Sequence, residues 1–338
     1  MAVQWDLSAI LAEYPTEYRP YRVEDLGCAG GFSGARFWRL HTAAGRLCLR
    51  QWPAEHPALD QLQFIQAALW HVTLEGFDRV PLPRETRGQA GFVRHGGRFW
   101  EVSPWLPGKA DFRENPSVER LRAAMTVLAE FHRAAESFPI PDPQPAVSPG
   151  IRRRLEQLQG WVAGDLAALM QSVHHALWPE LEPRVGRILQ LAPRTTGDVL
   201  CLLSRASRVI VPLQVAIGDI WHDHVLYVGD RVSGLVDFGS MRIDSVATDI
   251  ARLLGSVAGD NAFLRREGLD AYQATRPLSV VEQTLIDAFD RSTVLMSGLN
   301  WIDWIYRQRR VFESKQAVPG RLDDIVRRLE YLAMEKPS

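Results

Sequence analysis

Residues 217–249 decide the fold, and they read IGDIWHDHVLYVGDRVSGLVDFGSMRIDSVATD. The centre of this stretch predicts a β-hairpin, with strands at 225–228 and 231–236 joined by Gly229-Asp230, a pair favoured in two-residue turns. Counting outward from the turn places the residue after the second strand opposite 222–224, because paired residues of a hairpin are equidistant from its turn. The hairpin is therefore expected to gather five acidic and histidine side chains, namely Asp219, His222, Asp223, His224 and Asp237.

Elsewhere the chain predicts strands first and helices later. Spacing in the first hundred residues predicts two hairpins and one helix, at 37–52, 92–103 and 60–70. Asp60 is expected to cap that helix. Outside the hairpin region, helical spacing then predominates over 118–136, 151–191 and 239–336. This order of elements indicates an α+β fold.

The segment Pro104-Trp-Leu-Pro-Gly108 interrupts regular structure and is expected to separate two lobes. A chain of 338 residues is long enough for both. We expect a small β-rich N-terminal lobe at 1–103, a hinge at 104–108 and a larger, mainly helical lobe at 109–338. A helical insertion is expected in the larger lobe, around 150–195.

Composition and charge narrow the functional classes. The formal net charge of -1 gives no electrostatic reason to expect nucleic acid or an anionic membrane as a partner. No apolar run approaches the ~18 residues that a membrane span needs, and the first residues do not read as a signal peptide. Three widely spaced cysteines favour free thiols, so a cytoplasmic location is expected. The oligomeric state stays open.

The motifs Ile217-Gly-Asp219, with His224 five residues after the aspartate, and Asp237-Phe-Gly239 resemble those of the aminoglycoside phosphotransferase and choline kinase family. The resemblance implies a two-lobed, protein-kinase-like fold. It also implies transfer of the γ-phosphoryl group of ATP or GTP, with Mg²⁺ or Mn²⁺, to a hydroxyl of a small molecule. Asp219 would be the catalytic base, Asp237 a metal ligand, and Asp249 a support of the catalytic loop.

Two residues depart from the family pattern. Ile217 replaces a supporting histidine, and His224 stands where the family has a metal-binding asparagine. Imidazole is a poorer ligand than oxygen for Mg²⁺, so His224 ligates a different metal, Asp223 replaces it, or it only makes hydrogen bonds in the loop. A pseudokinase that binds nucleotide without transfer is the main alternative. A transition-metal hydrolase centre at His222-Asp-His224 is a third.

The resemblance also assigns a nucleotide site. Gly31, Ser33 and Gly34 would cover the triphosphate, and Arg50 would supply the phosphate-binding cation, since no lysine precedes Lys109. Three other residues would line or bind the adenine, namely Cys48, Pro104 through its carbonyl and Leu106 through its N–H. The carboxylate that usually pairs with the cation is not evident on the following helix. Gln63 or Gln66 is expected in its place.

The acceptor is not specified by any motif. Trp301 and Trp304 would flank a sugar or a cationic headgroup, or simply pack against other helices. Only residues 239–248 lie between Asp237-Phe238 and Asp249, which is too short for a segment that docks a polypeptide. The acceptor is therefore expected to be a small molecule, with sugar, amino alcohol, amino acid and aminoglycoside-like compounds all open.

Overall fold

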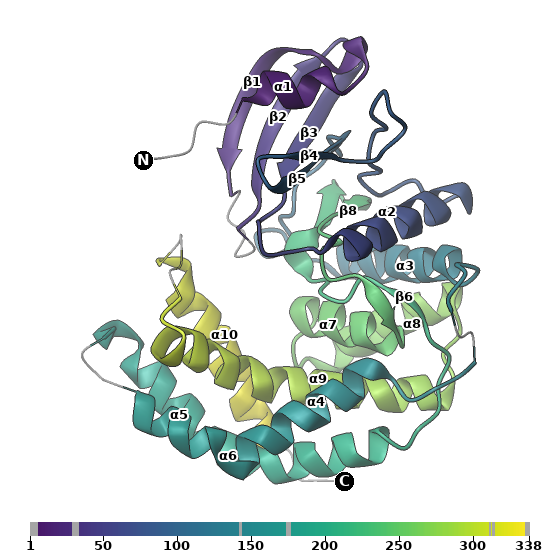
Figure 1. Cartoon of the computed structure of the whole chain (residues 1–338). Helices are drawn as coiled ribbons and strands as arrows, with labels where there is room; N and C mark the ends of the chain where they lie inside the picture. Colours follow the sequence, from purple (N-terminus) through teal and green to yellow (C-terminus); the bar gives the residue numbers. More distant parts are fainter. Residues whose placement is uncertain are drawn as a thin grey trace. The chain divides into compact units, whose positions relative to one another are not determined.

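A computed structural model describes residues 6–28, 34–141, 144–173, 177–310, 312 and 315–334 (Figure 1). The chain divides into two compact units, each described here by itself. The first comprises residues 1–111 and 223–239, and the second comprises residues 112–222 and 240–338. The mixture of a small antiparallel sheet and a larger helical part confirms the predicted α+β class.

The first unit is built on a five-stranded antiparallel sheet in the order β1-β2-β3-β5-β4. Its strands and helices are α1 (Leu7–Ala12), β1 (Pro20–Gly27), β2 (Arg36–Thr42), β3 (Gly45–Gln51), α2 (Leu59–Leu74), β4 (Val93–His95) and β5 (Arg98–Pro104), with a 3₁₀ turn at Thr16–Tyr18. Both predicted hairpins of this region are confirmed. The predicted cap is wrong, because α2 begins one residue earlier and Asp60 lies inside its first turn.

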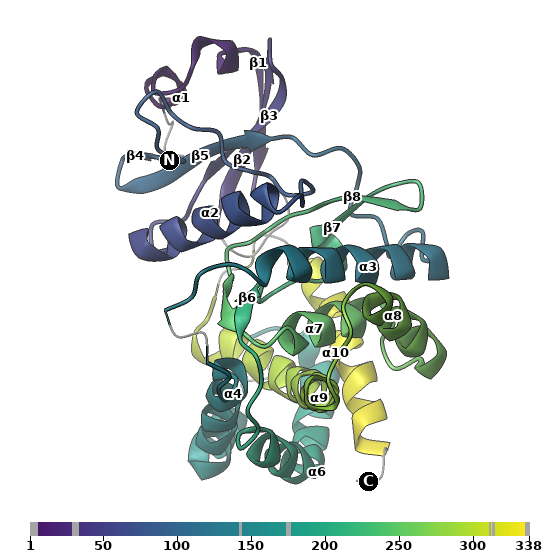
Figure 2. The ribbon, with the colours of Figure 1, turned by 90° about the vertical axis from the view of Figure 1, so that its right-hand side faces the viewer.

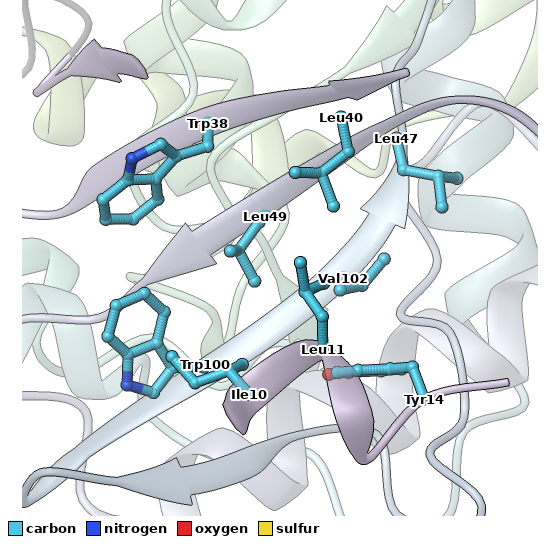
Figure 3. Close-up of a cluster of buried hydrophobic side chains, with 9 residues drawn as sticks. All are labelled: Ile10, Leu11, Tyr14, Trp38, Leu40, Leu47, Leu49, Trp100 and Val102. Carbon is cyan, nitrogen blue, oxygen red and sulfur yellow. The ribbon is translucent and has the colours of Figure 1, made fainter. Parts of the chain in front are cut away.

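One face of this sheet forms the core of the first unit (Figure 3). The members of this cluster are Ile10, Leu11, Tyr14, Trp38, Leu40, Leu47, Leu49, Trp100 and Val102. The strand residues alternate with polar ones, so their side chains share a face, and α1 covers that face. Trp38 and Trp100 stack with their ring centroids 5.4 Å apart. Burying each large apolar side chain contributes about 1.5–3 kcal/mol, which fixes the strands in this register.

The opposite face of the sheet carries polar side chains. Cys48 and Arg50 alternate with the core leucines of β3, and Arg50 lies opposite Glu101 of β5 in the strand register. Helix α2 reaches this face, where Gln66 Nε2 donates to Glu101 Oε2 at 3.2 Å. Figure 2 shows α1 and α2 on opposite sides of the sheet. The polar and ionisable side chains of the sheet therefore lie on the face that α2 reaches.

The predicted hairpin 225–236 is present as β7 (Val225–Val228) and β8 (Arg231–Leu235) and belongs to the first unit. It is joined there to the segment that follows β5. The backbones of Tyr227 and Lys109 exchange hydrogen bonds of 2.8 and 3.0 Å, and Ser233 Oγ donates to the Pro107 carbonyl at 2.6 Å. These contacts hold residues 107–109 against the hairpin.

The second unit is mainly helical. Its elements are α3 (Val118–Ala135), α4 (Pro149–Gly160), α5 (Leu166–Ser172), α6 (Glu182–Ala206), β6 (Gln214–Ala216), β9 (Arg242–Asp244), α7 (Ala247–Val257), α8 (Ala262–Thr275), α9 (Val280–Ile302) and α10 (Ala317–Met334). A 3₁₀ turn at Pro179–Leu181 and π-helical turns at Trp161–Asp165 and Asp303–Arg307 join some of them. The 3₁₀ turn His222–His224 leads into β7.

Helix α9 is central to the second unit and packs against α4, α6, α7 and α10 (Figure 2). The helix predicted over 151–191 is interrupted, because Gly164 adopts a φ of 153° that an α-helix does not allow. The helical region also continues further, to the end of α6 at Ala206. Among the described residues, no helix combines the length and apolarity required to cross a membrane.

Candidate active site

The loop that carries Asp219 begins on a braced backbone in the second unit. The buried carboxylate of Asp249 accepts hydrogen bonds from the backbone N–H groups of Ile217 at 2.6 Å and Gly218 at 2.7 Å. Hydrogen bonds to a charged acceptor are shorter and stronger than neutral ones. Asp249 therefore fixes the backbone immediately before Asp219, in the supporting position that the resemblance implied.

Position 218 requires glycine. Gly218 has a φ of 87°, and a Cβ there would collide with the Ser240 carbonyl and the Arg242 guanidinium. The tight approach of residue 240 to the loop is therefore possible only because this residue has no side chain. It follows that the Gly-Asp pair is needed for the shape of the loop as well as for the carboxylate.

A buried histidine completes the support of Asp249. His132 of α3 is fully buried, with Nε2 3.1 Å from Asp249 Oδ2 and Nδ1 2.7 Å from the Tyr272 hydroxyl. Burial lowers the pKa of His132, although the neighbouring carboxylate of Asp249 opposes the shift. A neutral imidazole suits these partners, because it donates from Nε2 to the carboxylate and accepts at Nδ1 from the phenol.

The carboxylate of Asp219 is hydrogen-bonded to an arginine. Its Oδ1 accepts a hydrogen bond of 2.8 Å from Nε of Arg252 on α7, and half of the Asp219 side chain is exposed (50%). A carboxylate with this exposure is accessible to a small molecule, while the arginine fixes its orientation. Sequence reasoning identified Asp219 but missed Arg252, which lies three residues after Asp249 in the same helix.

The hairpin brings His224 and Asp237 together in the first unit. The Val236 N–H donates to the His224 carbonyl at 2.9 Å, and His224 Nε2 lies 3.6 Å from Asp237 Oδ2. The predicted hairpin and the approach of residues 222–224 to Asp237 are confirmed, but the register shifts by one residue at a bulge between Leu226 and Tyr227, so that Val225 pairs with Leu235. Asp237 has a φ of 63°, a conformation that aspartate tolerates better than most residues and that is often found at functional sites.

This pair fits a metal that is shared with a nucleotide. It offers one imidazole nitrogen and one carboxylate, and among the described residues no cluster of three or more such ligands exists. A divalent metal on a nucleotide takes its remaining ligands from phosphate oxygens and water, so two protein ligands suffice. The same observation gives no support to a hydrolase centre at His222-Asp-His224.

Arg50 is held on two sides by residues of the first unit. Its Nη2 lies 3.2 Å from Asp237 Oδ1, and its Cζ lies 3.4 Å from the ring centroid of the buried Trp52. A guanidinium stacks in this way and an ammonium does not, which accounts for an arginine at this position. The buried Nε of Arg50 has no hydrogen-bond partner among the described residues. An unsatisfied buried donor of this kind is suited to an anionic ligand.

Glu101 supplies the carboxylate that α2 lacks. It lies opposite Arg50 in the β3–β5 ladder and accepts from Gln66, which also donates to the Gly91 carbonyl at 3.0 Å. Burial raises the pKa of Glu101, and Arg50 and Gln66 oppose that shift. Of the two glutamines considered from the sequence, Gln66 does make a hydrogen bond here. It donates to the carboxylate of Glu101 and does not replace that carboxylate as the neighbour of Arg50. Sequence reasoning missed Glu101, because its pairing with Arg50 joins two strands that are far apart in the chain.

The other predicted nucleotide residues have these positions. Cys48 and Pro104 lie on β3 and β5, and burial raises the pKa of the Cys48 thiol to about 12, so it stays neutral. Leu106 packs against Gly234 of β8. Gly34 is described and has a φ of 74°. The predictions for Gly31 and Ser33 lie outside the described residues.

The two tryptophans considered for the acceptor lie in an aromatic cluster of the second unit. Trp301 is buried and stacks on Phe312, with centroids 5.4 Å apart and planes at 17°. Trp304 is half-buried, 5.5 Å from Trp301, with the Arg310 guanidinium over its ring. Packing explains the position of Trp301, and contact of either ring with an acceptor stays a prediction.

These features define a class of protein. A β-rich unit with a stacked arginine, a hairpin that joins a histidine to an aspartate, and a braced Gly-Asp loop match the parts of protein-kinase-like phosphotransferases. The model of the phosphotransferase enzyme family matches residues 26–280, which is more than half of the chain. The chain therefore belongs to the phosphotransferase enzyme family.

Individual proteins are similar to this chain in sequence or in fold. A homoserine kinase of Methylobacterium nodulans is 28% identical over 286 residues, which cover 82% of this chain and 80% of the relative. The amicoumacin kinase hAmiN, solved with AMP-PNP, Ca²⁺ and Ami, superposes with a TM-score of 0.62 at 13% identity, over 98% of this chain and 93% of hAmiN. A microcompartment-associated aminopropanol kinase gives a TM-score of 0.61 at 13% identity, over 98% and 99%.

The activity follows at the level of the reaction class. The chain is a small-molecule kinase, which transfers a phosphoryl group from ATP to an alcohol group of its acceptor. This confirms the prediction of a small-molecule kinase.

Proposed function

We propose that the acceptor is a small amino acid with a primary hydroxyl, and that L-homoserine is the first compound to test. The support is the similarity to the homoserine kinase of Methylobacterium nodulans, which extends over 286 residues. An alignment of that length is far longer than the first unit, so it includes most of the second, where Asp219 and Asp249 lie. Similarity restricted to nucleotide-binding residues would carry no information about the acceptor.

The exposed carboxylate of Asp219, oriented by Arg252, is the single observation that carries the chemistry. In the proposed reaction the acceptor oxygen forms a bond to the γ-phosphorus, and the bond from that phosphorus to the bridging oxygen of ADP breaks. The hydroxyl proton passes to Asp219, which acts as the base. Asp249 and His132 keep the loop in place and do not touch the reacting atoms.

Residues of the first unit would hold the nucleotide. Arg50 would leave Asp237 to bind phosphate oxygens, and its unsatisfied Nε would gain an acceptor. His224 and Asp237 would hold Mg²⁺ or Mn²⁺, which supplies charge neutralisation on the phosphates. Glu101 would orient Arg50 from the neighbouring strand. The free thiols of Cys28, Cys48 and Cys201 favour the cytoplasm as the site of action.

Phosphorus NMR of reactions with ATP tests the acceptor. L-homoserine, L-serine, 3-aminopropanol and an aminoglycoside are each offered to the enzyme with Mg²⁺ and with Mn²⁺. The proposal expects a phosphate monoester of L-homoserine at the highest rate. Efficient phosphorylation of the aminoglycoside with no reaction of L-homoserine would show that the acceptor class is wrong while the kinase assignment stands.

A further inference from the structure

A cluster of three arginines lies next to Asp219 in the second unit. Arg252 donates to Asp219, and Arg113 is hydrogen-bonded to Asp324. Arg321 of α10 joins them, since all three line one hollow of about 870 Å³. Among the described residues no carboxylate forms an ion pair with Arg321. Arg252 and Arg113 thus each have a carboxylate partner, Asp219 and Asp324, and Arg321 is the member of the cluster whose charge has none among the described residues.

Trp221 fixes where that charge lies. The Cζ atoms of Arg252 and Arg321 are 5.5 and 4.9 Å from the centre of its indole ring. Cation–π contacts orient a guanidinium and leave its N–H edge available for hydrogen bonds. Because Trp221 is only two residues after Asp219, the guanidinium of Arg321 is tied to the immediate surroundings of the base.

An anion is the ligand that this arrangement accommodates. Burial and the charges of Arg252 and Arg113 lower the pKa of Arg321 to about 10, although Asp324 and Asp219 oppose the shift. Even so, the guanidinium is charged at neutral pH. A half-buried charge that lacks a partner is unfavourable, and a carboxylate corrects this with two parallel hydrogen bonds.

We propose that Arg321, held on Trp221, binds the carboxylate of the acceptor, so that the enzyme selects amino acids over amino alcohols. This inference rests on the proposed function, because it assumes that an acceptor hydroxyl lies at Asp219. L-homoserine has its hydroxyl and its carboxylate at opposite ends of a short chain, which suits a base and a cation on neighbouring residues. A second source of anionic oxygens is the phosphoryl group in transfer, and the experiment must separate the two.

The acceptors L-homoserine and 3-aminopropanol make a matched pair, since the second is the first without its carboxylate. We expect wild type to prefer L-homoserine in kcat/KM. Arg321→Gln should raise the KM for L-homoserine about 10- to 100-fold, as expected for loss of a charge-assisted contact, and leave kcat/KM for 3-aminopropanol within about twofold. The control Arg208→Gln, an exposed arginine outside the hollow, should change neither.

Equal losses with both acceptors would overturn the proposal, because a contact to the phosphoryl group or to the fold affects both alike. Unchanged values with both would overturn it as well. If Arg321→Gln is unstable, Arg321→Lys provides the test. It keeps the charge and should retain part of the preference for L-homoserine, whereas loss of turnover with both acceptors would again contradict the proposal.

Binding separates this inference from the proposed function. Calorimetry with L-2-aminobutyrate, which has the carboxylate but no hydroxyl, needs no turnover. Binding to wild type that weakens at least tenfold in Arg321→Gln would support the carboxylate site even if neither acceptor were phosphorylated. Identical binding to the two proteins, or none to wild type, would overturn the site even if L-homoserine were a substrate.

Discussion

Arg50 Nη2 and Asp237 Oδ1 are 3.2 Å apart, so the cation and the carboxylate proposed for the triphosphate and its metal are paired with each other. The pair is unequal in exposure, since 12% of the Arg50 side chain is accessible but 41% of Asp237. Partial exposure of Asp237 keeps the net strength of such a pair modest. When nucleotide and metal bind, this contact can therefore be replaced by two stronger ones, from Arg50 to a phosphate and from Asp237 to the metal.

Arg50→Ala should weaken ATP binding at least tenfold. A charge-assisted contact to phosphate is typically worth about 1.5–3 kcal/mol, and alanine also removes the stacking on Trp52. Calorimetry with ATP and with adenosine checks this, because adenosine has no phosphates and should bind equally to both proteins. Arg46→Ala, an exposed arginine on the same strand, is the matched control. Unchanged ATP affinity in Arg50→Ala would exclude Arg50 from the nucleotide site.

Gln66→Leu should destabilise the first unit by about 1–3 kcal/mol. Gln66 donates to the buried Glu101 and to the Gly91 carbonyl, and leucine leaves both acceptors without that donor. Chemical denaturation measures the change. The matched control is Gln63→Leu, an exposed residue on the same helix, which should stay within about 0.5 kcal/mol of wild type. Equal effects of the two variants would mean that the hydrogen bond from Gln66 to Glu101 does not contribute to the free energy of unfolding.

Asp219→Asn should reduce turnover by about 10²–10⁴-fold and change ATP affinity little. The amide keeps the shape of the side chain but cannot accept the hydroxyl proton. Steady-state kinetics with the phosphorylated acceptor and nucleotide binding by calorimetry test the two parts separately. Asp230→Asn, in the exposed turn of the hairpin, serves as the control. Near-normal turnover of Asp219→Asn would remove Asp219 from the role of base.

The stability of the chain should fall as the pH drops below about 6.5, in part because of His132. Its pKa is lowered in the folded state, so between the folded and unfolded pKa values only the unfolded chain takes up this proton. The stability that the neutral imidazole confers is thus complete above the unfolded pKa and is lost as the pH falls toward the folded one. The slope is at most about 1.4 kcal/mol per pH unit for one proton.

His132→Gln tests this, because the amide can still donate to Asp249 but does not titrate. Unfolding free energies of both proteins are measured at pH 7.5, 6.5 and 5.5. The difference between wild type and variant should shrink toward low pH, since only wild type loses the contribution of His132. A difference that is constant with pH would show that His132 does not titrate differently in the folded and unfolded states.

The sequence predicted those features whose geometry is local. The Gly229-Asp230 turn specifies its hairpin, so the approach of residues 222–224 to Asp237 followed from counting residues, although a bulge between Leu226 and Tyr227 shifts the register by one. Glu101 and Arg321 could not be found in this way. Each meets its partner across a sheet or between segments that are far apart in the chain, and no local spacing encodes such contacts. Helix ends were also missed, because Gly164 interrupts a stretch whose apolar spacing reads as continuous.

His224 should give the enzyme a stronger preference for Mn²⁺ over Mg²⁺ than asparagine would. If the imidazole and Asp237, 3.6 Å apart, share the metal, a nitrogen ligand occupies the place of an amide oxygen. Mg²⁺ prefers oxygen ligands, whereas Mn²⁺ accepts imidazole more readily. His224→Asn should therefore shift the ratio of ATP affinities with the two metals toward Mg²⁺, as measured by calorimetry. Asp223→Asn, next in the chain and exposed, should leave the ratio unchanged. The same ratio in wild type and His224→Asn, with a shift in Asp223→Asn, would assign the second ligand to Asp223 instead.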